Sequence, residues 1–203
     1  MLGRFEQARE CIARSKAISQ ELVAPELWFV AECFAQVELL ANDPAAAERG
    51  LREWEVQRRH GERAWWAASL MAETLYRQGR FADAEPYARV AQAETSEADV
   101  YLQIMWRNVG SKLLARQGDF DRAEELAREA VELGEPTDWL NLRGDTLMDL
   151  GEVLRLAGRL DEAVAAVKQA LSLYTQKRNI VSTRRARAVI KELRASPTTA
   201  SGS

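Results

Sequence analysis

Histidine and cysteine are scarce in this sequence. It has one histidine, His60, and two cysteines, Cys11 and Cys33, among 203 residues. A single histidine excludes the HExxH zinc motif, and a nucleophilic triad or most zinc sites would depend on that one residue. His60 lies in RRHG (58–61), a pattern typical of a helix C-terminus, so we expect a solvated side chain. Two cysteines without a CxxC pair cannot form a disulfide framework, so we expect two buried thiols in a cytoplasmic protein.

Long apolar runs, strong charge of one sign and catalytic motifs are also missing. No uninterrupted apolar run approaches the roughly 18 residues that a membrane-spanning helix needs, and the first ten residues contain no apolar signal core. We therefore expect neither a membrane segment nor export. A net charge of −3 does not indicate a nucleic-acid binder. GSK (110–112) lacks the upstream glycine and the hydroxyl of a phosphate-binding loop, and GxSxG is absent. We expect no catalytic residue, cofactor or metal, and no enzyme activity.

What the sequence does have is a six-residue pattern that occurs five times. The first residues of the copies are 39, 37, 39 and 40 residues apart, and a fixed period of about 20 to 50 residues is typical of stacked repeats. The leading glycine or asparagine predicts a left-handed helix end, and the closing alanine lets two helices approach closely. An aromatic or leucine (Phe5, Phe81, Phe120, Leu160) is expected to anchor each corner. The copies are GRFEQA (3–8), NDPAAA (42–47), GRFADA (79–84), GDFDRA (118–123) and GRLDEA (158–163).

The segments between these corners predict amphipathic helices. Apolar residues recur at three- and four-residue steps, and the alternation typical of strands is missing. SEAD (96–99) resembles a capping box that opens a helix. The fold class is therefore predicted to be all-α, with antiparallel helix pairs. We expect about ten helices, near 4–22, 25–41, 44–60, 63–78, 81–94, 97–117, 120–134, 138–157, 160–177 and 180–194.

The repeats resemble tetratricopeptide repeats. Residues 146–174, TLMDLGEVLRLAGRLDEAVAAVKQALSLY, carry nearly the whole pattern of that family, and weaker copies occur at 107–133, 68–94 and 31–57. The period is longer than the family's usual length of about 34 residues, and Trp54 occupies a place that is normally small. The resemblance implies a right-handed superhelical solenoid that binds a protein or peptide partner in its concave groove.

A narrower resemblance points to a biological context. Residues 41–63, 99–133 and 137–164 are similar to the helical C-terminal regions of large bacterial signalling proteins. Those proteins combine a class III adenylate/guanylate cyclase domain, or a LuxR-type DNA-binding domain, with an ATPase module and a repeat array. The resemblance implies a regulatory or signal transduction module, with such domains as neighbours in a longer chain. A free-standing adaptor or scaffold protein is the alternative.

The two ends of the sequence bear on domain organisation. We expect one repeat domain over 1–195 and a disordered tail over 196–203, because SPTTASGS is small and polar. The array begins halfway through a repeat, with only its second helix present. The apolar stripe of the helix expected near 4–22 would then lack a partner. We infer a fragment of a longer polypeptide or an end covered by self-association in a homo-oligomer, with a short natural gene as the alternative.

The first helix of each pair is expected to line the concave groove. In the family's architecture this surface recognises a partner segment, with apolar contacts for affinity and charges for register. The sequence does not show the lysine and asparagine set with which chaperone-binding members hold a C-terminal carboxylate. The candidate groove residues are Glu32, Gln36, Glu73, Arg77, Asn108, Lys112, Arg116, Asp149, Glu152 and Arg155.

Charged clusters and tryptophans offer further hypotheses. Asp145, Asp149 and Glu152 share a helix face and could hold a cation, but we favour a solvated face with Arg155 nearby. Residues 119–152 contain eleven acidic and three basic residues, whereas residues 177–194 contain seven basic residues and one acid, so head-to-tail contact between copies is conceivable. The basic helix could also bind nucleic acid, although it lacks aromatic residues for base stacking. We expect most of the six tryptophans in the core, with Trp65 or Trp66 the exception.

Overall fold

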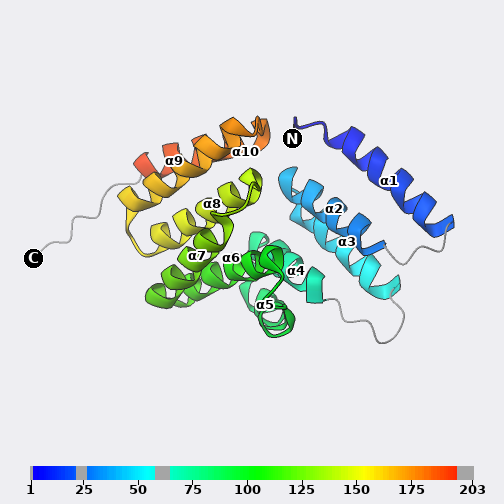
Figure 1. The fold of residues 1–203 in the computed structure, drawn as a ribbon, viewed down its shortest axis with the longest axis horizontal. Helices are drawn as coiled ribbons and strands as arrows, with labels where there is room; N and C mark the ends of the chain where they lie inside the picture. The colour runs from blue at the N-terminus through cyan, green and yellow to red at the C-terminus, as the bar shows by residue number, and fades with distance from the viewer. Residues whose placement is uncertain (1, 22–26, 58–64, 196–203) are drawn as a thin grey trace, which may run out of the picture. The chain divides into compact units, whose positions relative to one another are not determined.

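All of the secondary structure that can be described is α-helical. The computed structural model describes residues 2–21, 27–57 and 65–195, which form ten helices and no strand (Figure 1). The predicted all-α solenoid of antiparallel helix pairs is confirmed for these residues. His60 and the expected tail at 196–203 lie outside the described residues.

The helices fall into two compact units, which we describe separately. The first is Gly3–Ser96 and the second is formed mainly by Glu97–Ser203. The single repeat domain expected over 1–195 stays a prediction. The first unit contains α1 (Phe5–Glu21), α2 (Leu27–Leu40), α3 (Pro44–Gln57), α4 (Trp65–Arg77) and α5 (Phe81–Glu94). In this unit α2 packs on α3, α4 packs on α5, and α1 lies against α2.

The second unit repeats the same arrangement. Here α6 packs on α7 and α8 packs on α9, α6 also contacts α8, and α10 packs on α9 (Figure 1). Stacking of one pair on the next buries the apolar face that a single pair would leave in water. The helices are α6 (Val100–Gln117), α7 (Phe120–Gly134), α8 (Leu140–Leu156), α9 (Leu160–Gln176) and α10 (Ile180–Ala195).

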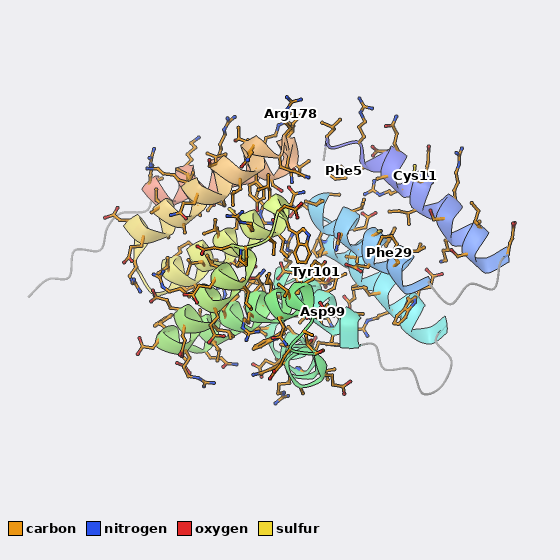
Figure 2. The ribbon with its side chains drawn as sticks, viewed as in Figure 1. Phe5, Cys11, Phe29, Asp99, Tyr101 and Arg178 are labelled. Carbon is orange, nitrogen blue, oxygen red and sulfur yellow. The ribbon has the colours of Figure 1, made fainter. Side chains whose placement is uncertain are left out.

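Four corner sequences, which begin at Asn42, Gly79, Gly118 and Gly158, join one helix to the next as the repeat predicts. The first corner precedes α1, which begins at Phe5 (Figure 2). Each leading residue has a positive φ, from 63° at Asn42 to 88° at Gly118. In the corner after α6, the amide of Asp119 donates to the carbonyl of Leu114 at 3.1 Å, and the amide of Gly118 donates to Ala115 at 3.2 Å. These bonds satisfy carbonyls that the end of α6 leaves without intrahelical donors, so the left-handed residue both ends the helix and closes the turn.

Three closing alanines of the corners are more deeply buried than the aromatic residues. Ala47, Ala84 and Ala123 have no exposed surface, as expected where two helix backbones meet. Phe81 contacts Tyr76, with ring centroids 5.0 Å apart. Phe120 is 39% exposed, so it is only partly covered at its corner.

Helix α6 begins later in the sequence than expected. The helix begins at Val100 rather than at residue 97, because Asp99 is its N-cap. The Asp99 carboxylate accepts a hydrogen bond from the Leu102 amide at 3.1 Å. A carboxylate at this position satisfies one of the free amides of the first turn. The SEAD sequence therefore places its cap at its last residue and not at its first.

Close packing of α8 on α9 depends on two glycines. A β-carbon at Gly144 would lie 2.5 Å from Cε1 of Tyr174, and one at Gly151 would lie 2.7 Å from Cγ2 of Val167. Both distances are shorter than van der Waals contact, so larger residues would force the helices apart. The Tyr174 ring therefore lies against the backbone of α8 at Gly144, and its hydroxyl donates to the Asp145 carboxylate.

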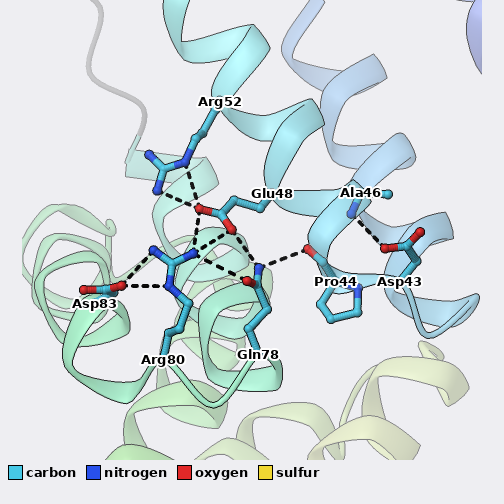
Figure 3. A network of polar contacts seen from close by, with 8 residues as sticks. All are labelled: Asp43, Pro44, Ala46, Glu48, Arg52, Gln78, Arg80 and Asp83. Carbon is cyan, nitrogen blue, oxygen red and sulfur yellow. Dashed lines mark hydrogen bonds and ion pairs between the residues drawn. The ribbon is translucent and has the colours of Figure 1, made fainter.

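Ion pairs join one corner to the next in the first unit. Glu48 accepts hydrogen bonds from Arg80 at 2.8 Å and from Gln78 at 2.8 Å, and it pairs with Arg52 at 2.7 Å (Figure 3). Arg80 also pairs with Asp83 at 2.7 Å. Arg80 follows the glycine of its corner, whereas Glu48 belongs to the helix of the previous corner. The arginine therefore ties α3 to the start of α5.

The same arrangement recurs in the second unit. Arg159 follows the corner glycine Gly158 and binds Glu124 of the previous corner's helix, while Arg128 pairs with Glu124 at 2.7 Å. Arg159 also pairs with Glu162 at 2.6 Å. Burial by itself would raise the pKa of Glu124, but hydrogen bonds from the two arginines outweigh it and lower the pKa. We call these two sets of residues the corner clamps.

Candidate functional site

Five of the predicted groove residues are bound to one another across α6 and α8. Lys112 Nζ lies 2.9 Å from Asp149 Oδ1, and Arg116 Nη2 lies 3.0 Å from Glu152 Oε1. Arg155 extends this set, with its Nη2 3.8 Å from Glu152 Oε1. The pairs form because residues one repeat apart on α6 and α8 occupy equivalent positions, which the stacking of repeats places side by side.

The two α6–α8 ion pairs differ in how deeply their side chains are buried. The side chain of Lys112 is only 2% exposed and that of Asp149 is 15% exposed, whereas Arg116 and Glu152 are 33% and 25% exposed. One turn before Lys112, the Asn108 amide donates to the Thr146 hydroxyl at 3.4 Å, and both residues are buried. The set therefore runs from buried contacts at the start of α8 to accessible charges at its end.

The four remaining candidates lie on α2 and α4 of the first unit. Gln36 donates to Glu32 at 2.9 Å, and Arg77 pairs with Glu73 at 2.6 Å. Arg77 also donates to the carbonyl of Leu39 at 3.1 Å, which ties α4 to the end of α2. Each of these side chains is therefore engaged in contacts within its own unit.

A groove lies between α8 and α10. Its volume is about 310 Å³, and its apolar surface comes from Met148, Val189 and Leu193 together with the backbone at Gly151. Four charged side chains of both signs line it as well: Glu152, Arg155, Arg185 and Glu192. Glu152 and Arg155 are thus the two predicted groove residues that reach this groove.

The α10 wall of the groove was not predicted from the sequence. Arg185 and its neighbours were expected in a terminal basic helix with no place on a concave surface. The repeat spacing could have indicated this wall, because α10 begins about half a repeat after Gly158, where the first helix of a further pair is expected. A helix at that position is the first member of the next pair, whose inner face lines the groove.

The three carboxylates that share one face of α8 each have a different partner. Asp145 accepts from Tyr174, Asp149 pairs with Lys112, and Glu152 pairs with Arg116. Among residues 2–21, 27–57 and 65–195, no three histidine, cysteine or acidic side chains are grouped as a metal ion would require. Over the same ranges, no helix is long and apolar enough to cross a bilayer. Each of these three carboxylates therefore has a side-chain partner on a neighbouring helix.

The first unit contains an apolar pocket of about 170 Å³ between α1, α2 and α3. Ile12, Val30, Phe34 and Trp54 are among the side chains that line it. Two ion pairs join α1 to its neighbours beside the pocket: Arg9 with Glu38 at 2.7 Å and Lys16 with Glu53 at 2.6 Å. The large residue at position 54 is therefore accommodated by the space beneath α1.

The two cysteines and the tryptophans occupy varied environments. Cys11 is exposed, contrary to expectation, and Cys33 is half-buried, which raises the pKa of its thiol. Trp106 is buried and its indole donates to Gln103 at 3.0 Å, as expected for a core residue. Trp139 is 44% exposed and meets Tyr101 edge-on at 6.2 Å. The side chains of Trp28, Trp65 and Trp66 lie outside the part that the structure describes.

Comparisons with known proteins bear on this architecture. No curated protein matches the sequence. A solved structure, the crystal structure of BtubC (BKLC) from P. vanneervenii, is similar with a TM-score of 0.54 and 18% sequence identity. The match covers 95% of this chain and 91% of that one. At this identity the likeness supports the helical-repeat fold alone.

Two family models match the sequence directly. Residues 101–176 match one tetratricopeptide repeat model, and residues 65–89 match another. The first match spans α6 to α9, and the second covers α4 and the first part of α5. The helix pairs within these two stretches are therefore similar to tetratricopeptide repeats.

Proposed function

We propose that the chain is a non-catalytic interaction module whose α8–α10 groove holds a segment of a peptide or protein partner. The observation that carries this proposal is the groove itself, which is lined by apolar side chains together with the charged Glu152, Arg155, Arg185 and Glu192. Apolar contacts would supply affinity, and charges of both signs would fix the register of the bound segment. Tetratricopeptide repeats generally mediate protein–protein interactions, which agrees with this use of the surface.

The α6–α8 pairs and the corner clamp of the second unit support a preformed groove. They join α8 to α6 and the start of α9 to α7 through charged contacts, so the α8 wall would be ordered before the partner binds. A preformed site avoids part of the conformational entropy cost of binding. In this proposal Lys112 and Asp149 set the spacing of α6 and α8, while Glu152 and Arg155 contact the partner.

We further propose that the module belongs to a signalling protein and transmits binding to a neighbouring domain. The support is the resemblance of residues 41–63, 99–133 and 137–164 to helical regions of bacterial signalling proteins. An open reading frame that joins this chain to a cyclase, ATPase or LuxR-type domain would support the role. A separate gene flanked by unrelated frames would favour a free-standing adaptor instead.

A displayed library of random peptides tests the groove. Peptides enriched on the wild-type chain should bind at least about tenfold more weakly to Val189→Glu, because a charged side chain would replace an apolar one in the groove lining. Ala188→Glu is the matched control, since Ala188 is the adjacent exposed residue and does not line the groove. Arg155→Glu should weaken binding of acidic peptides only. Equal binding by both glutamate variants, or failure to enrich any peptide, would contradict the proposal.

A further inference from the structure

The last helix presents a cluster of positive charge that the rest of its unit does not neutralise. Seven cations of 177–194 are exposed, and Glu192 is the only acid among them. Within the described residues none of these cations forms an ion pair, whereas Arg80, Arg116 and Arg159 each hold a carboxylate. The seven cations are Lys177, Arg178, Arg184, Arg185, Arg187, Lys191 and Arg194.

Helix α7 presents the opposite charge. Asp121, Glu125, Glu132 and Glu135 are exposed, and none has an ion-pair partner in the described part of the chain. Arg128 lies on the same face, but its charge is balanced by Glu124 at 2.7 Å. The face therefore carries a net negative charge, which we call the acidic stripe.

The two charged faces match in length. Asp121, Glu125 and Glu132 fall at steps of four and seven residues, so they share one side of α7 and span about 16 Å. Arg184, Lys191 and Arg194 likewise share one side of α10, and they span about 15 Å. We call this side of α10, with Arg187, the basic stripe. Because α10 packs on α9 while α7 packs on α6 and α8, the two stripes remain exposed in a single copy.

We propose that the basic stripe of one copy docks on the acidic stripe of a second copy. Opposite charges of similar length would align the two helices, and the attraction would be strongest at low ionic strength. Because the two surfaces differ, each added copy leaves one stripe of each kind available, and the assembly grows head to tail. This inference stands independently of the partner groove.

A second copy suits the basic stripe better than nucleic acid does. Residues 177–195 contain no aromatic side chain that could stack on bases. The chain also carries a net charge of −3, which opposes the approach of a polyanion, whereas a complementary stripe is present in every copy.

Analytical ultracentrifugation of the full chain tests the proposal. At about 20 mM NaCl the weight-average mass should rise with protein concentration, and at about 300 mM NaCl the chain should be monomeric. Reversal of the basic stripe, R184E/R187E/K191E, should weaken association at least about tenfold. The control R4E/R14E/R89E changes the net charge equally at exposed arginines of the first unit and should associate like the wild type.

A second reversal gives a rescue experiment. The variant E125K/E132K/E135K should also be monomeric, but an equimolar mixture with R184E/R187E/K191E should associate, because each variant then meets its opposite charge. Circular dichroism confirms that both variants are folded. A wild-type chain that stays monomeric at low salt overturns the proposal, as does association that the basic-stripe reversal leaves unchanged. Retention of a DNA duplex at low salt without self-association also overturns it, in favour of nucleic acid.

Discussion

The buried pair between Lys112 and Asp149 gives the sharpest test of the structure. Lys112 is predicted from the sequence to contact a partner, but its side chain is 2% exposed and its Nζ lies 2.9 Å from Asp149 Oδ1. If the pair holds α6 on α8, its loss should destabilise the fold. The perturbation is Lys112→Met, which keeps the aliphatic stem and removes the charge.

The expected magnitude follows from burial. Removal of one partner from a buried ion pair costs about 3–5 kcal/mol, because the other charge stays buried. Asp149 is 15% exposed and keeps some hydration, so the loss should lie near the lower end, about 3 kcal/mol. Replacement of both charges by apolar residues, Lys112→Met with Asp149→Leu, should lie within about 1 kcal/mol of the wild type, since no charge then remains buried.

Urea unfolding followed by circular dichroism measures these differences. With a slope of about 2 kcal/mol per molar urea, a loss of about 3 kcal/mol lowers the midpoint by about 1.5 M. Lys168→Met, at an exposed lysine of α9, is the control and should change the free energy of unfolding by less than about 0.5 kcal/mol. A wild-type midpoint for Lys112→Met would refute the reasoning. So would a double variant as unstable as the sum of the two single ones.

Three further predictions concern single positions. Arg178 has a φ of 58°, so Arg178→Gly should raise the thermal midpoint, with a gain of up to about 1 kcal/mol. The pKa of Glu124 is lowered in the fold, so the stabilisation by its carboxylate is present near neutral pH and lost as the pH falls below about 4. The difference in unfolding free energy between wild type and Glu124→Gln should shrink over that acid range. Burial, followed by the nearby Asp145 carboxylate, raises the pKa of Tyr174, so the wild type should lose stability above about pH 10. Tyr174→Phe should lose less stability over that alkaline range, as chemical denaturation at each pH would show.

Each of these predictions has an outcome that contradicts it. Loss of stability in Arg178→Gly would mean that the arginine side chain outweighs the backbone strain. A constant difference between wild type and Glu124→Gln from neutral to acid pH would show that the clamp does not depend on the glutamate charge. Equal alkaline unfolding of wild type and Tyr174→Phe would exclude ionisation of Tyr174 as the cause.

The corners were predictable because their determinants are local. A left-handed residue at Gly118 or Gly158 is favoured by glycine itself, whatever the rest of the chain does. Asn42 was recognised in the same place because asparagine tolerates this conformation better than most residues. The start of α6 at Val100 was missed because Ser96 and Asp99 can both cap a helix, and the sequence does not rank them.

The candidate site was less predictable because side-chain partners lie far apart in the sequence. Arg116 reaches Glu152 and Arg159 reaches Glu124 only when successive repeats stack. The family resemblance predicted that residues such as Lys112 line the concave surface, but it carries no information on how deeply each side chain is buried. The same limit applies to Phe120, which the pattern places at a corner without indicating that the residue is 39% exposed.

The sequence by itself determined that this chain forms helices, where they turn, and that the turns recur at a nearly fixed period. Backbone conformation and apolar periodicity act over a few residues, so they can be read along the chain. Only the tertiary structure decided which charges on the inner face are buried against a neighbouring helix and which line the groove between α8 and α10. That division depends on how closely α6 and α10 approach α8, which is decided by contacts between residues far apart in the sequence, such as Lys112 with Asp149 at 2.9 Å.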